Sequence, residues 1–372
     1  MGKIDNILIA QEDSEQIKQL ITSNFPLPSI RPRQLEIIAF AVKSIIAGKK
    51  NIIIEAPTGV GKSAVAICIS NIFNTIVDAR TTIITKTKGL QDQYIKDFSY
   101  ISDIRSKYDY ECSHNRDLTT RIVYNSQECK MITGKFGGQK RCNPKSDCTY
   151  YKKRREWQYD AKTRLTNFNF FINAGPLILD NVVEGKSSRS EITIVDEAHN
   201  IPKQIIEASA ITFEESEIAD LFALLDPYPS LVDFNAIATL KSAIKTVIKE
   251  ISMESEEEDL IYIHSYKKVF YQLEQSAQFL ILGIEGAIAK IERKKNLTSA
   301  DANKLDVLAK IKQFIDHFVL FNKVIEDSAK DTQYIISKLD SNNMNLYPLF
   351  AKSTSKHFLR SKGDVTIYIS AT

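Results

Sequence analysis

A glycine-bearing loop between two apolar segments is the feature that most constrains this 372-residue chain. The apolar run Asn51–Glu55 leads into Ala56–Ser63 (APTGVGKS), and a second apolar run, Ser63–Phe73, follows it. The first run has the length and branched side chains of a buried strand, whereas the second is typical of a helix. A strand that passes through such a loop into a helix is the repeating unit of parallel sheets covered by helices. We therefore expect an α/β fold.

The residue types in this loop are those that hold phosphate groups. Gly59 and Gly61 allow backbone amides to turn inward around anionic oxygens, and the following helix directs its N-terminus at the same point. Lys62 can reach terminal phosphates, and the Ser63 hydroxyl can hold Mg²⁺. The first position is Ala56, where such loops usually have glycine. We predict that ATP with Mg²⁺ is bound by Ala56, Pro57, Thr58, Gly59, Val60, Gly61, Lys62 and Ser63.

A second element completes this prediction. The apolar run Ile192–Val195 ends in the tetrad DEAH, which begins at Asp196 and ends at His199. An aspartate at the end of a neighbouring strand supplies a carboxylate to the bound Mg²⁺, and the adjacent Glu197 can orient and deprotonate an attacking water. We therefore predict that Lys62, Asp196 and Glu197 act in nucleotide hydrolysis.

Alternation of strands and helices defines one α/β domain with two insertions. The expected strands are Asn51–Glu55, Thr81–Thr85, Leu165–Ala174, Leu177–Leu179, Ile192–Val195 and Gly363–Ile369. Between them lie a cysteine-rich stretch and a long stretch with helical periodicity. The predicted boundaries are 1–105, 165–204 and 350–372 for the α/β domain, 106–164 for the cysteine-rich insertion and 205–349 for an all-helical insertion.

Four of the five cysteines fall in the first insertion with the spacing C-x16-C-x12-C-x5-C, and Cys68 lies apart in an apolar segment. Four thiolates can hold a [4Fe–4S] cluster or one zinc ion. Structural zinc sites favour short C-x2–4-C pairs, which this stretch lacks, so the spacing favours the cluster over zinc, with free thiols as a third alternative. The predicted ligands are Cys112, Cys129, Cys142 and Cys148.

Charge is unevenly distributed along the chain. The net charge is only +3, yet residues 80–165 contain 19 Lys and Arg against 10 Asp and Glu. Such a local basic excess is typical of a segment that binds a polyanion, although a solvated charged face is the alternative. Lys152–Arg155 is the densest basic run, and aromatic residues such as Trp157 lie beside it, as in proteins that bind single strands.

With these motifs in view, the chain resembles superfamily 2 helicases, and its cysteines resemble those of the iron–sulfur helicases of the XPD/DinG type. The stretch RPRQ, TKTKGLQDQ, the cysteines, DEAH and the final SAT follow one another in the order found in that family. The resemblance implies a RecA-like P-loop domain, adenine contacts from Arg31 and Gln34, and a helical arch. It also implies 5′-to-3′ travel on single-stranded or forked DNA. The DNA contacts that we expect are Thr85, Thr87, Lys88, Gln91, Lys152, Arg154 and Arg155.

The sequence stops at the SAT segment, so the second motor domain of this family, with its arginine finger, is not part of it. We expect that domain in a missing C-terminal part or a separate chain, and slow hydrolysis without it. The alternatives are a catalytically poor, ATP-gated module that binds single-stranded DNA, or a redox or damage sensor that uses the cluster.

The N-terminus lacks the apolar core of a signal peptide, and no uncharged apolar stretch is long enough to span a membrane. We therefore expect no membrane partner and a location in the cytoplasm, or in the nucleus of a eukaryotic cell.

Overall fold

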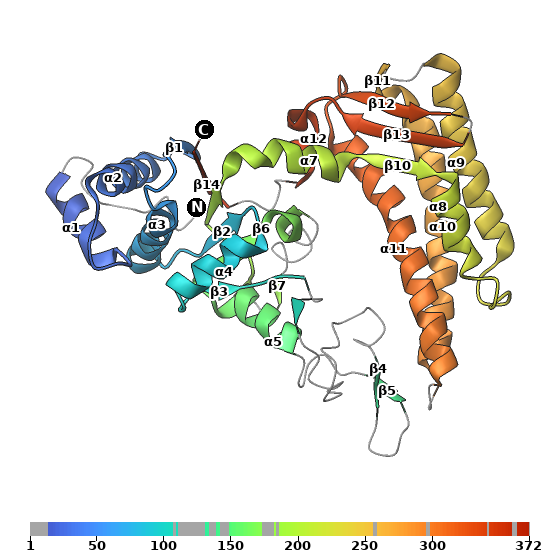
Figure 1. Cartoon of the computed structure of the whole chain (residues 1–372), viewed down its shortest axis with the longest axis horizontal. Helices are drawn as coiled ribbons and strands as arrows, with labels where there is room; N and C mark the ends of the chain where they lie inside the picture. The colour runs from blue at the N-terminus through green and yellow to red at the C-terminus, as the bar shows by residue number, and fades with distance from the viewer. Residues whose placement is uncertain are drawn as a thin grey trace. The chain divides into compact units, whose positions relative to one another are not determined.

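The computed structural model describes most of the chain. The described residues are 14–106, 109–110, 131–133, 139–141, 149–172, 182–183, 186–255, 259–294, 298–340, 342–358 and 363–371. The chain divides into two compact units, which are treated separately below (Figure 1). The first unit comprises Met1–Lys107, Thr149–Gln204 and Phe358–Thr372, and the second comprises Tyr108–Cys148 and Ile205–His357.

A six-stranded sheet forms the centre of the first unit, with the strand order β1-β14-β9-β2-β6-β3. All of its strand pairs are parallel. The strands are β1 (Asn51–Glu55), β2 (Thr81–Thr85), β3 (Ser102–Asp103), β6 (Thr163–Asn167), β9 (Ile192–Asp196) and β14 (Val365–Ser370). Strand β14 lies between β1 and β9, where Ile367 pairs with Ile52 on one side and with Ile194 on the other. The α/β architecture expected from the sequence is thus confirmed.

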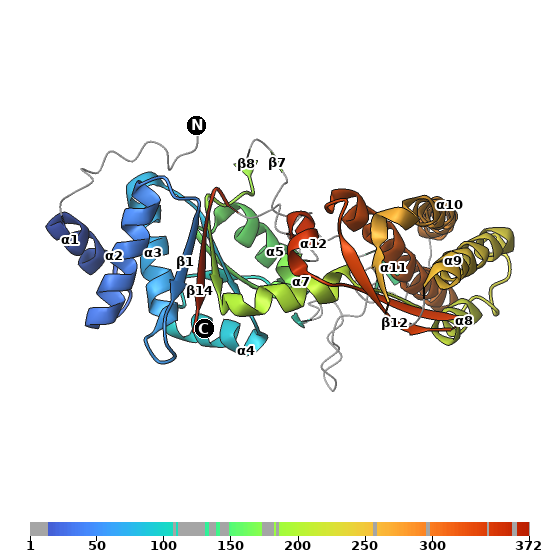
Figure 2. The same cartoon turned by 90° about the horizontal axis from the view of Figure 1, so that it is seen from above.

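Helices cover this sheet. They are α1 (Ser14–Asn24), α2 (Pro32–Ile46), α3 (Lys62–Val77), α4 (Lys88–Asp97) and α5 (Thr149–Arg155), which continues into a π-helix at Glu156–Asp160. A 3-10 turn (Ala198–Asn200) and α7 (Ile201–Ser209) follow β9. Figure 2 shows α2 and α3 side by side next to β1 and β14. Every residue of β2 and β9 is buried, as expected for central parallel strands that are covered on both faces.

The second unit contains a four-stranded antiparallel sheet in addition to its helices. Its strands are β10 (Ile211–Glu214), β11 (Leu260–Tyr262), β12 (Gln333–Leu339) and β13 (Asn343–Pro348), in the order β10-β13-β12-β11. Its helices are α8 (Glu215–Ala223), α9 (Phe234–Glu254), α10 (Lys267–Glu292), α11 (Ser299–Asp327) and α12 (Ala351–Phe358), with a 3-10 turn at Ile263–Tyr266. The prediction of an all-helical insertion over 205–349 is therefore wrong.

The sheet and the long helices of the second unit share one core. The rings of Phe213 on β10 and Phe318 on α11 stack with centroids 5.5 Å apart. Tyr334 on β12 is fully buried and packs edge-on against Phe321 of α11. Strands β10 and β12 thus each contribute an aromatic side chain that packs against a phenylalanine of α11. This packing buries apolar surface of both the sheet and the helix.

Most expected elements of the first unit agree with the structure, but one does not. The strand expected over Leu165–Ala174 ends at Asn167, and residues 168–172 are helical. The Asn167 side chain accepts a hydrogen bond from Phe170 N at 2.9 Å, which caps this helical turn. The strand expected at Leu177–Leu179 lies outside the described residues. Four short strands, β4 (Met131–Thr133), β5 (Gln139–Arg141), β7 (Val182–Val183) and β8 (Lys186–Ser187), form two antiparallel pairs.

The central position of β14 predicts a large difference between two isoleucines of this sheet. Ile367 is fully buried in β14, whereas Ile53 on the edge strand β1 is 77% exposed. We expect Ile367→Ala to lower the free energy of unfolding by about 2–5 kcal/mol because it leaves a cavity. Ile53→Ala should change it by about 0.5 kcal/mol or less. Urea unfolding followed by circular dichroism measures both, and equal losses would contradict the core position of β14.

Candidate functional site

The glycine loop and the DEAH tetrad meet at one edge of the six-stranded sheet. The loop follows β1, the tetrad follows β9, and β14 between them ends at Ser370. Because parallel strands present their carboxyl ends at the same edge, segments that are far apart in sequence converge there. Helix α3 begins at Lys62, so the free amide groups of its first turn belong to the same edge.

Arg31 and Gln34 contact the backbone of the loop. Arg31 Nη1 donates to Gly59 O at 2.9 Å, and Gln34 Nε2 donates to Val60 O at 2.9 Å. The Gln34 Oε1 atom accepts from Arg31 N at 3.0 Å, which ties the two residues together at the start of α2. Gln34 is 3% exposed. The pair therefore fixes the outward-facing carbonyl groups of the loop.

An ion pair joins the two halves of the site. Lys62 Nζ lies 2.9 Å from Glu197 Oε1, and both side chains are largely shielded from solvent. Glu197 has φ 56° and ψ 47°, in the left-handed region that non-glycine residues rarely adopt. This backbone is held by hydrogen bonds from Glu197 N to Asp196 Oδ1 and from Asn200 N to Glu197 O. The strained turn directs the Glu197 carboxylate toward the loop.

Asp196 is buried and has a partner that the sequence did not reveal. Its Oδ2 atom accepts a hydrogen bond from the Tyr94 hydroxyl at 3.0 Å. Burial raises the pKa of the Asp196 carboxyl above its ordinary value, while the Tyr94 hydrogen bond and Lys62 act in the opposite direction. Burial also raises the pKa of Tyr94 well above its usual range. In the sequence, only the spacing of Tyr94 three residues after Gln91 on α4 could indicate that Tyr94 faces the site, because residues i and i+3 share one helix face.

The last residue of the tetrad connects to the end of β14. His199 Nδ1 lies 2.8 Å from Ser370 Oγ, and 3.4 Å from Glu197 Oε2. His199 Nε2 lies 2.8 Å from Asn200 Nδ2. The DEAH and SAT segments are thus linked side chain to side chain beside the Lys62–Glu197 pair.

The donor set fits Mg-ATP. The loop supplies the ammonium group of Lys62 and the helix terminus for phosphate, and Ser63 and Asp196 offer the oxygen ligands that Mg²⁺ prefers. A Cβ atom added at Gly61 would lie 2.5 Å from Gln34 Nε2, so a larger residue at this position would displace the Gln34 amide. Asp196 is 4% exposed, and a buried carboxylate is stabilised by a cation beside it.

Of the expected DNA contacts on β2 and α4, two are buried and two are exposed. Gln91 donates from Nε2 to Ile104 O at 3.2 Å and accepts at Oε1 from Asn167 Nδ2 at 2.8 Å. Thr85 is also fully buried, and its hydroxyl lies within hydrogen-bond distance of the main chain. Thr87 and Lys88 are exposed at the start of α4. In this structure, the buried Thr85 and Gln91 stabilise the segment that carries the exposed Thr87 and Lys88.

The basic run lies on α5, which returns the chain to the sheet. Lys152 and Arg155 are exposed, and Arg154 Nε donates to Gln158 Oε1 at 3.3 Å. Trp157 is a core residue with 1% exposure, and its Nε1 donates to Leu165 O at 3.0 Å. The Trp157 indole therefore anchors α5 to β6, and it has no free face on which a base could stack.

The predicted cluster ligands Cys112, Cys129, Cys142 and Cys148 lie outside the described residues. Cys68 is buried in α3, and burial raises its thiol pKa to about 12. Within the described part of the chain, no group of three or more His, Cys, Asp or Glu is placed to hold a metal ion. Over the same residues, no helix is long and apolar enough to cross a membrane.

The sheet with its glycine loop and acidic pair is consistent with a RecA-like domain. Residues 27–226 match the family model of the type III restriction enzyme res subunit. The match spans more than half of the chain, so this chain belongs to that family, whose domain is a DEAD/DEAH-like superfamily 2 helicase N-terminal domain. A comparison with curated proteins found no match. The family match extends to the helicase class and not to its iron–sulfur subdivision.

The crowding at Gly61 gives a test of the loop geometry. Gly59 and Gly61 both have positive φ angles, 78° and 84°, but no atom lies within 4 Å of a Cβ added at Gly59. Each change to alanine should cost about 1–2 kcal/mol of unfolding free energy through its backbone. Gly61→Ala should cost roughly 1 kcal/mol or more in addition, because the new methyl group displaces Gln34.

The Gln34→Ala variant, combined with each glycine variant in a double-mutant cycle, isolates this contact. We expect a favourable coupling energy with Gly61→Ala and none with Gly59→Ala, as measured by urea unfolding. Equal coupling at both glycines would contradict the contact between Gln34 and Gly61.

Proposed function

We propose that the chain binds Mg-ATP at this sheet edge and couples hydrolysis of its β–γ bond to the separation of DNA strands. Membership of the res subunit family supports nucleotide hydrolysis in nucleic-acid processing. The observation that carries the proposal is the 2.9 Å contact between Lys62 Nζ and Glu197 Oε1. This contact brings the cation of the glycine loop next to the carboxylate that follows a different strand.

Each residue of the site has a role in this proposal. Residues 56–63 surround the phosphates with backbone amides, and Lys62 neutralises the terminal phosphates. Ser63 and Asp196 would hold Mg²⁺, which would supply positive charge to the phosphates during hydrolysis. Arg31 is exposed beside the loop, where it can also meet the base of the nucleotide, whereas the buried Gln34 holds Arg31 and the loop in place.

Lys62 and Glu197 would exchange partners during a turnover. While they are paired, Glu197 Oε1 is engaged by Lys62 Nζ. When Lys62 turns to the phosphates, Glu197 Oε1 becomes free to accept a proton from the attacking water. The hydrogen bonds that hold the strained Glu197 backbone keep this carboxylate in position.

A second RecA-like domain is part of the proposal because the helicase class closes its ATP site between two such domains. Its arginine would stabilise the charge on the transferred phosphoryl group, which is worth about 10³–10⁵ in rate. In this proposal, the contact between His199 and Ser370 couples the ATP site to movement of the second domain, because it joins the DEAH tetrad to the end of β14. This arginine can come from a separate chain.

DNA binding is assigned to the exposed residues of the first unit. Thr87 and Lys88 lie next to each other at the start of α4, and Lys152 and Arg155 lie on α5. Cations at such positions follow a phosphate backbone. The iron–sulfur subdivision and 5′-to-3′ travel are also proposals, and they depend on the four cysteines of the first insertion.

The decisive measurement is ATP turnover by the chain with and without single-stranded DNA. Lys62→Ala should abolish nucleotide binding, because the loop loses the cation that meets the phosphates. Glu197→Gln should retain binding and lose turnover by about 10²-fold or more, because an amide does not accept the proton. Unchanged turnover in Glu197→Gln would remove this residue from its role.

The same measurement separates the helicase from the alternative of a binding module. Strong stimulation by single-stranded DNA, with unwinding of a forked duplex, supports a motor. Tight binding of ATP and DNA with almost no turnover, even after addition of a second motor domain, would favour an ATP-gated binding module. Loss of DNA affinity on reduction of the cluster, with unchanged ATPase activity, would favour a sensor.

The cluster can be tested separately from the ATPase. Protein purified without oxygen should contain iron and inorganic sulfide, and Cys148→Ser should lose both while nucleotide binding persists. Cys68→Ala is the matched control, because Cys68 is buried in α3 and should not affect the iron content. Zinc without iron in the wild-type protein would contradict the cluster.

A further inference from the structure

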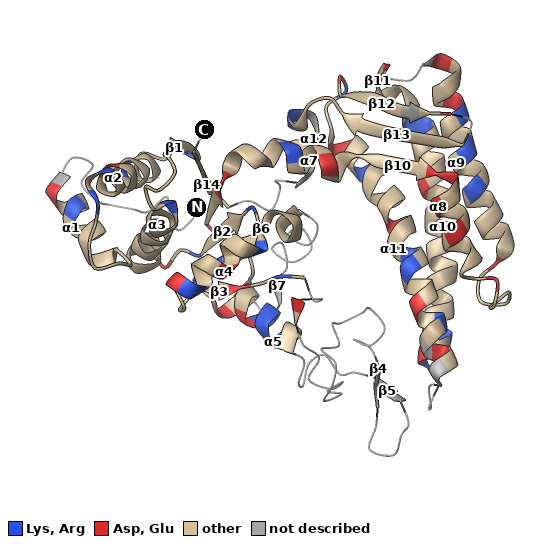
Figure 3. Cartoon of the chain, viewed as in Figure 1, with Lys and Arg blue, Asp and Glu red and all other residues tan. Residues whose placement is uncertain are grey.

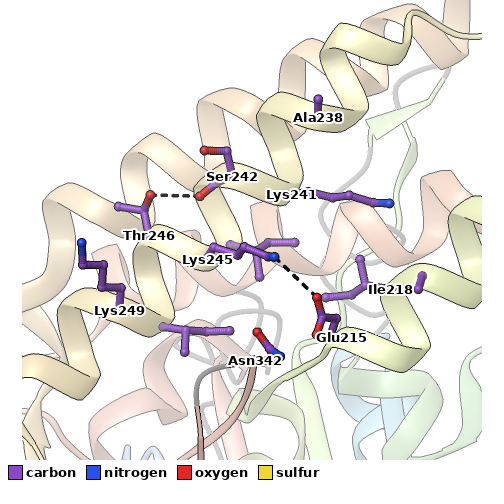
Figure 4. A pocket seen from close by; sticks show the side chains of 12 residues that line it. Glu215, Ile218, Ala238, Lys241, Ser242, Lys245, Thr246, Lys249 and Asn342 are labelled. Carbon is purple, nitrogen blue, oxygen red and sulfur yellow. Dashed lines mark hydrogen bonds and ion pairs between the residues drawn. The ribbon is translucent and has the colours of Figure 1, made fainter.

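A groove lies between helices α8 and α9 of the second unit, and none of the residues assigned to ATP lines it. Its volume is about 590 Å³, within the usual range for ligand pockets. Figure 4 shows α8 on one side, α9 on the other and Asn342 from the turn between β12 and β13 at one end. The residues that line it are Glu215, Ile218, Ala219, Ala238, Lys241, Ser242, Ile244, Lys245, Thr246, Ile248, Lys249 and Asn342.

The floor of this groove is aliphatic. Ile218 of α8 is 6% exposed and meets Ile244 and Ile248 of α9, which are 3% and 2% exposed. Ala219 and Ala238 are exposed and lack the bulk to fill the space between the helices. A floor of this kind accepts short apolar side chains from outside.

Lysines form a row along the α9 side of the groove. Lys241, Lys245 and Lys249 are all exposed and recur every four residues, about 6 Å apart along the helix. Figure 3 shows several blue bands of Lys or Arg along α9. Lys241 Nζ lies 5.3 Å from the centre of the Phe222 ring, and Lys245 Nζ lies 3.5 Å from Glu215 Oε1. Phe222 itself is buried, whereas the Lys245–Glu215 ion pair is exposed and therefore easily exchanged.

The groove is better suited to a protein helix than to a nucleic acid. None of the residues that line it is aromatic, whereas single-strand grooves use rings on which bases stack. A helix with carboxylates every four residues repeats at the same 6 Å interval as the lysine row, and its apolar residues at i and i+3 or i+4 can enter an aliphatic floor.

From this complementarity of charge and shape, we propose that the α8–α9 groove docks an acidic amphipathic helix of a partner protein. The partner helix places its apolar side chains over Ile218, Ile244 and Ile248. Its carboxylates meet the row of Lys241, Lys245 and Lys249. This docking surface is independent of the proposed ATP chemistry and adds a protein partner to it.

Selection from a displayed library of 16-residue peptides on the full chain tests this proposal directly. A variant with Lys241→Glu, Lys245→Glu and Lys249→Glu serves for counter-selection. We expect enriched peptides with Asp or Glu at four-residue spacing and apolar residues on the same face. The absence of any peptide that binds the wild-type chain and not the variant would overturn the proposal.

Fluorescence anisotropy with the leading peptide then measures the contributions of charge and shape. The triple lysine variant should bind at least about tenfold more weakly, because three attractive charges become repulsive. A control with Lys267→Glu, Lys268→Glu and Lys323→Glu has the same change in net charge at exposed positions outside the groove, and should bind within about twofold of wild type.

A neutral variant separates groove binding from attraction to a basic surface. Ala238→Trp fills the groove from an exposed helix position and leaves the charge unchanged, so we expect at least about tenfold weaker binding. Circular dichroism and ATP turnover should be unchanged in all these variants, since none is in the ATP site. Binding that survives Ala238→Trp would contradict docking in the groove. A labelled single-stranded oligonucleotide whose affinity falls in the lysine variant, while peptide affinity does not, would assign the surface to nucleic acid instead.

Discussion

Parallel pairing of β14 with both β1 and β9 is the interaction on which the rest of the first unit depends. Strand β1 delivers the glycine loop and β9 delivers the acidic pair, but the two strands do not touch each other. The backbone of β14 supplies the hydrogen bonds on both sides, with Ile367 paired to Ile52 and Ile194. The separation of Lys62 and Glu197 is therefore set by the width of one intervening strand. The same strand ends in Ser370, which contacts His199.

The fold of the first unit could largely be predicted from the sequence, because its signals are local. The apolar runs of β1, β2 and β9 are short, branched and bounded by polar residues, and each was predicted within about one residue. The end of β6 was not, since Phe168–Phe171 is as apolar as a strand. There the Asn167 side chain starts a helical turn, and such a capping contact outweighs β-propensity over a few residues.

The sheet of the second unit was missed for a different reason. In β12, Tyr334 and Ile336 are buried between partly exposed neighbours, and β13 has a similar alternation. Between the two strands, Asp340 Oδ1 accepts a hydrogen bond from Asn343 N. That turn and the alternation of Tyr334 and Ile336 were visible signals of a hairpin. Strong helical periodicity on both sides of the hairpin masks these signals. In addition, β10 and β11 pair with the hairpin only over long sequence distances, which local patterns do not indicate.

The candidate site shows the same division between local and distant information. The residues of the loop and the tetrad were found by motif, and the structure brings Lys62 to Glu197 and links His199 to Ser370. The role of Tyr94 could not be predicted, because its contact with Asp196 depends on how α4 packs. Likewise, the burial of Gln91 follows from its contact with Asn167, a residue on another strand.

The position of β14 also determines when the site can form during synthesis. The strand that joins β1 to β9 comes after the whole second unit in the chain, so a ribosome completes the second unit before it releases the last strand of the first. Until then, β1 with the glycine loop has no strand partner, and β9 with the acidic pair has an unpaired edge. The site proposed to bind nucleotide is consequently completed late in synthesis, once the chain has been made through Ser370.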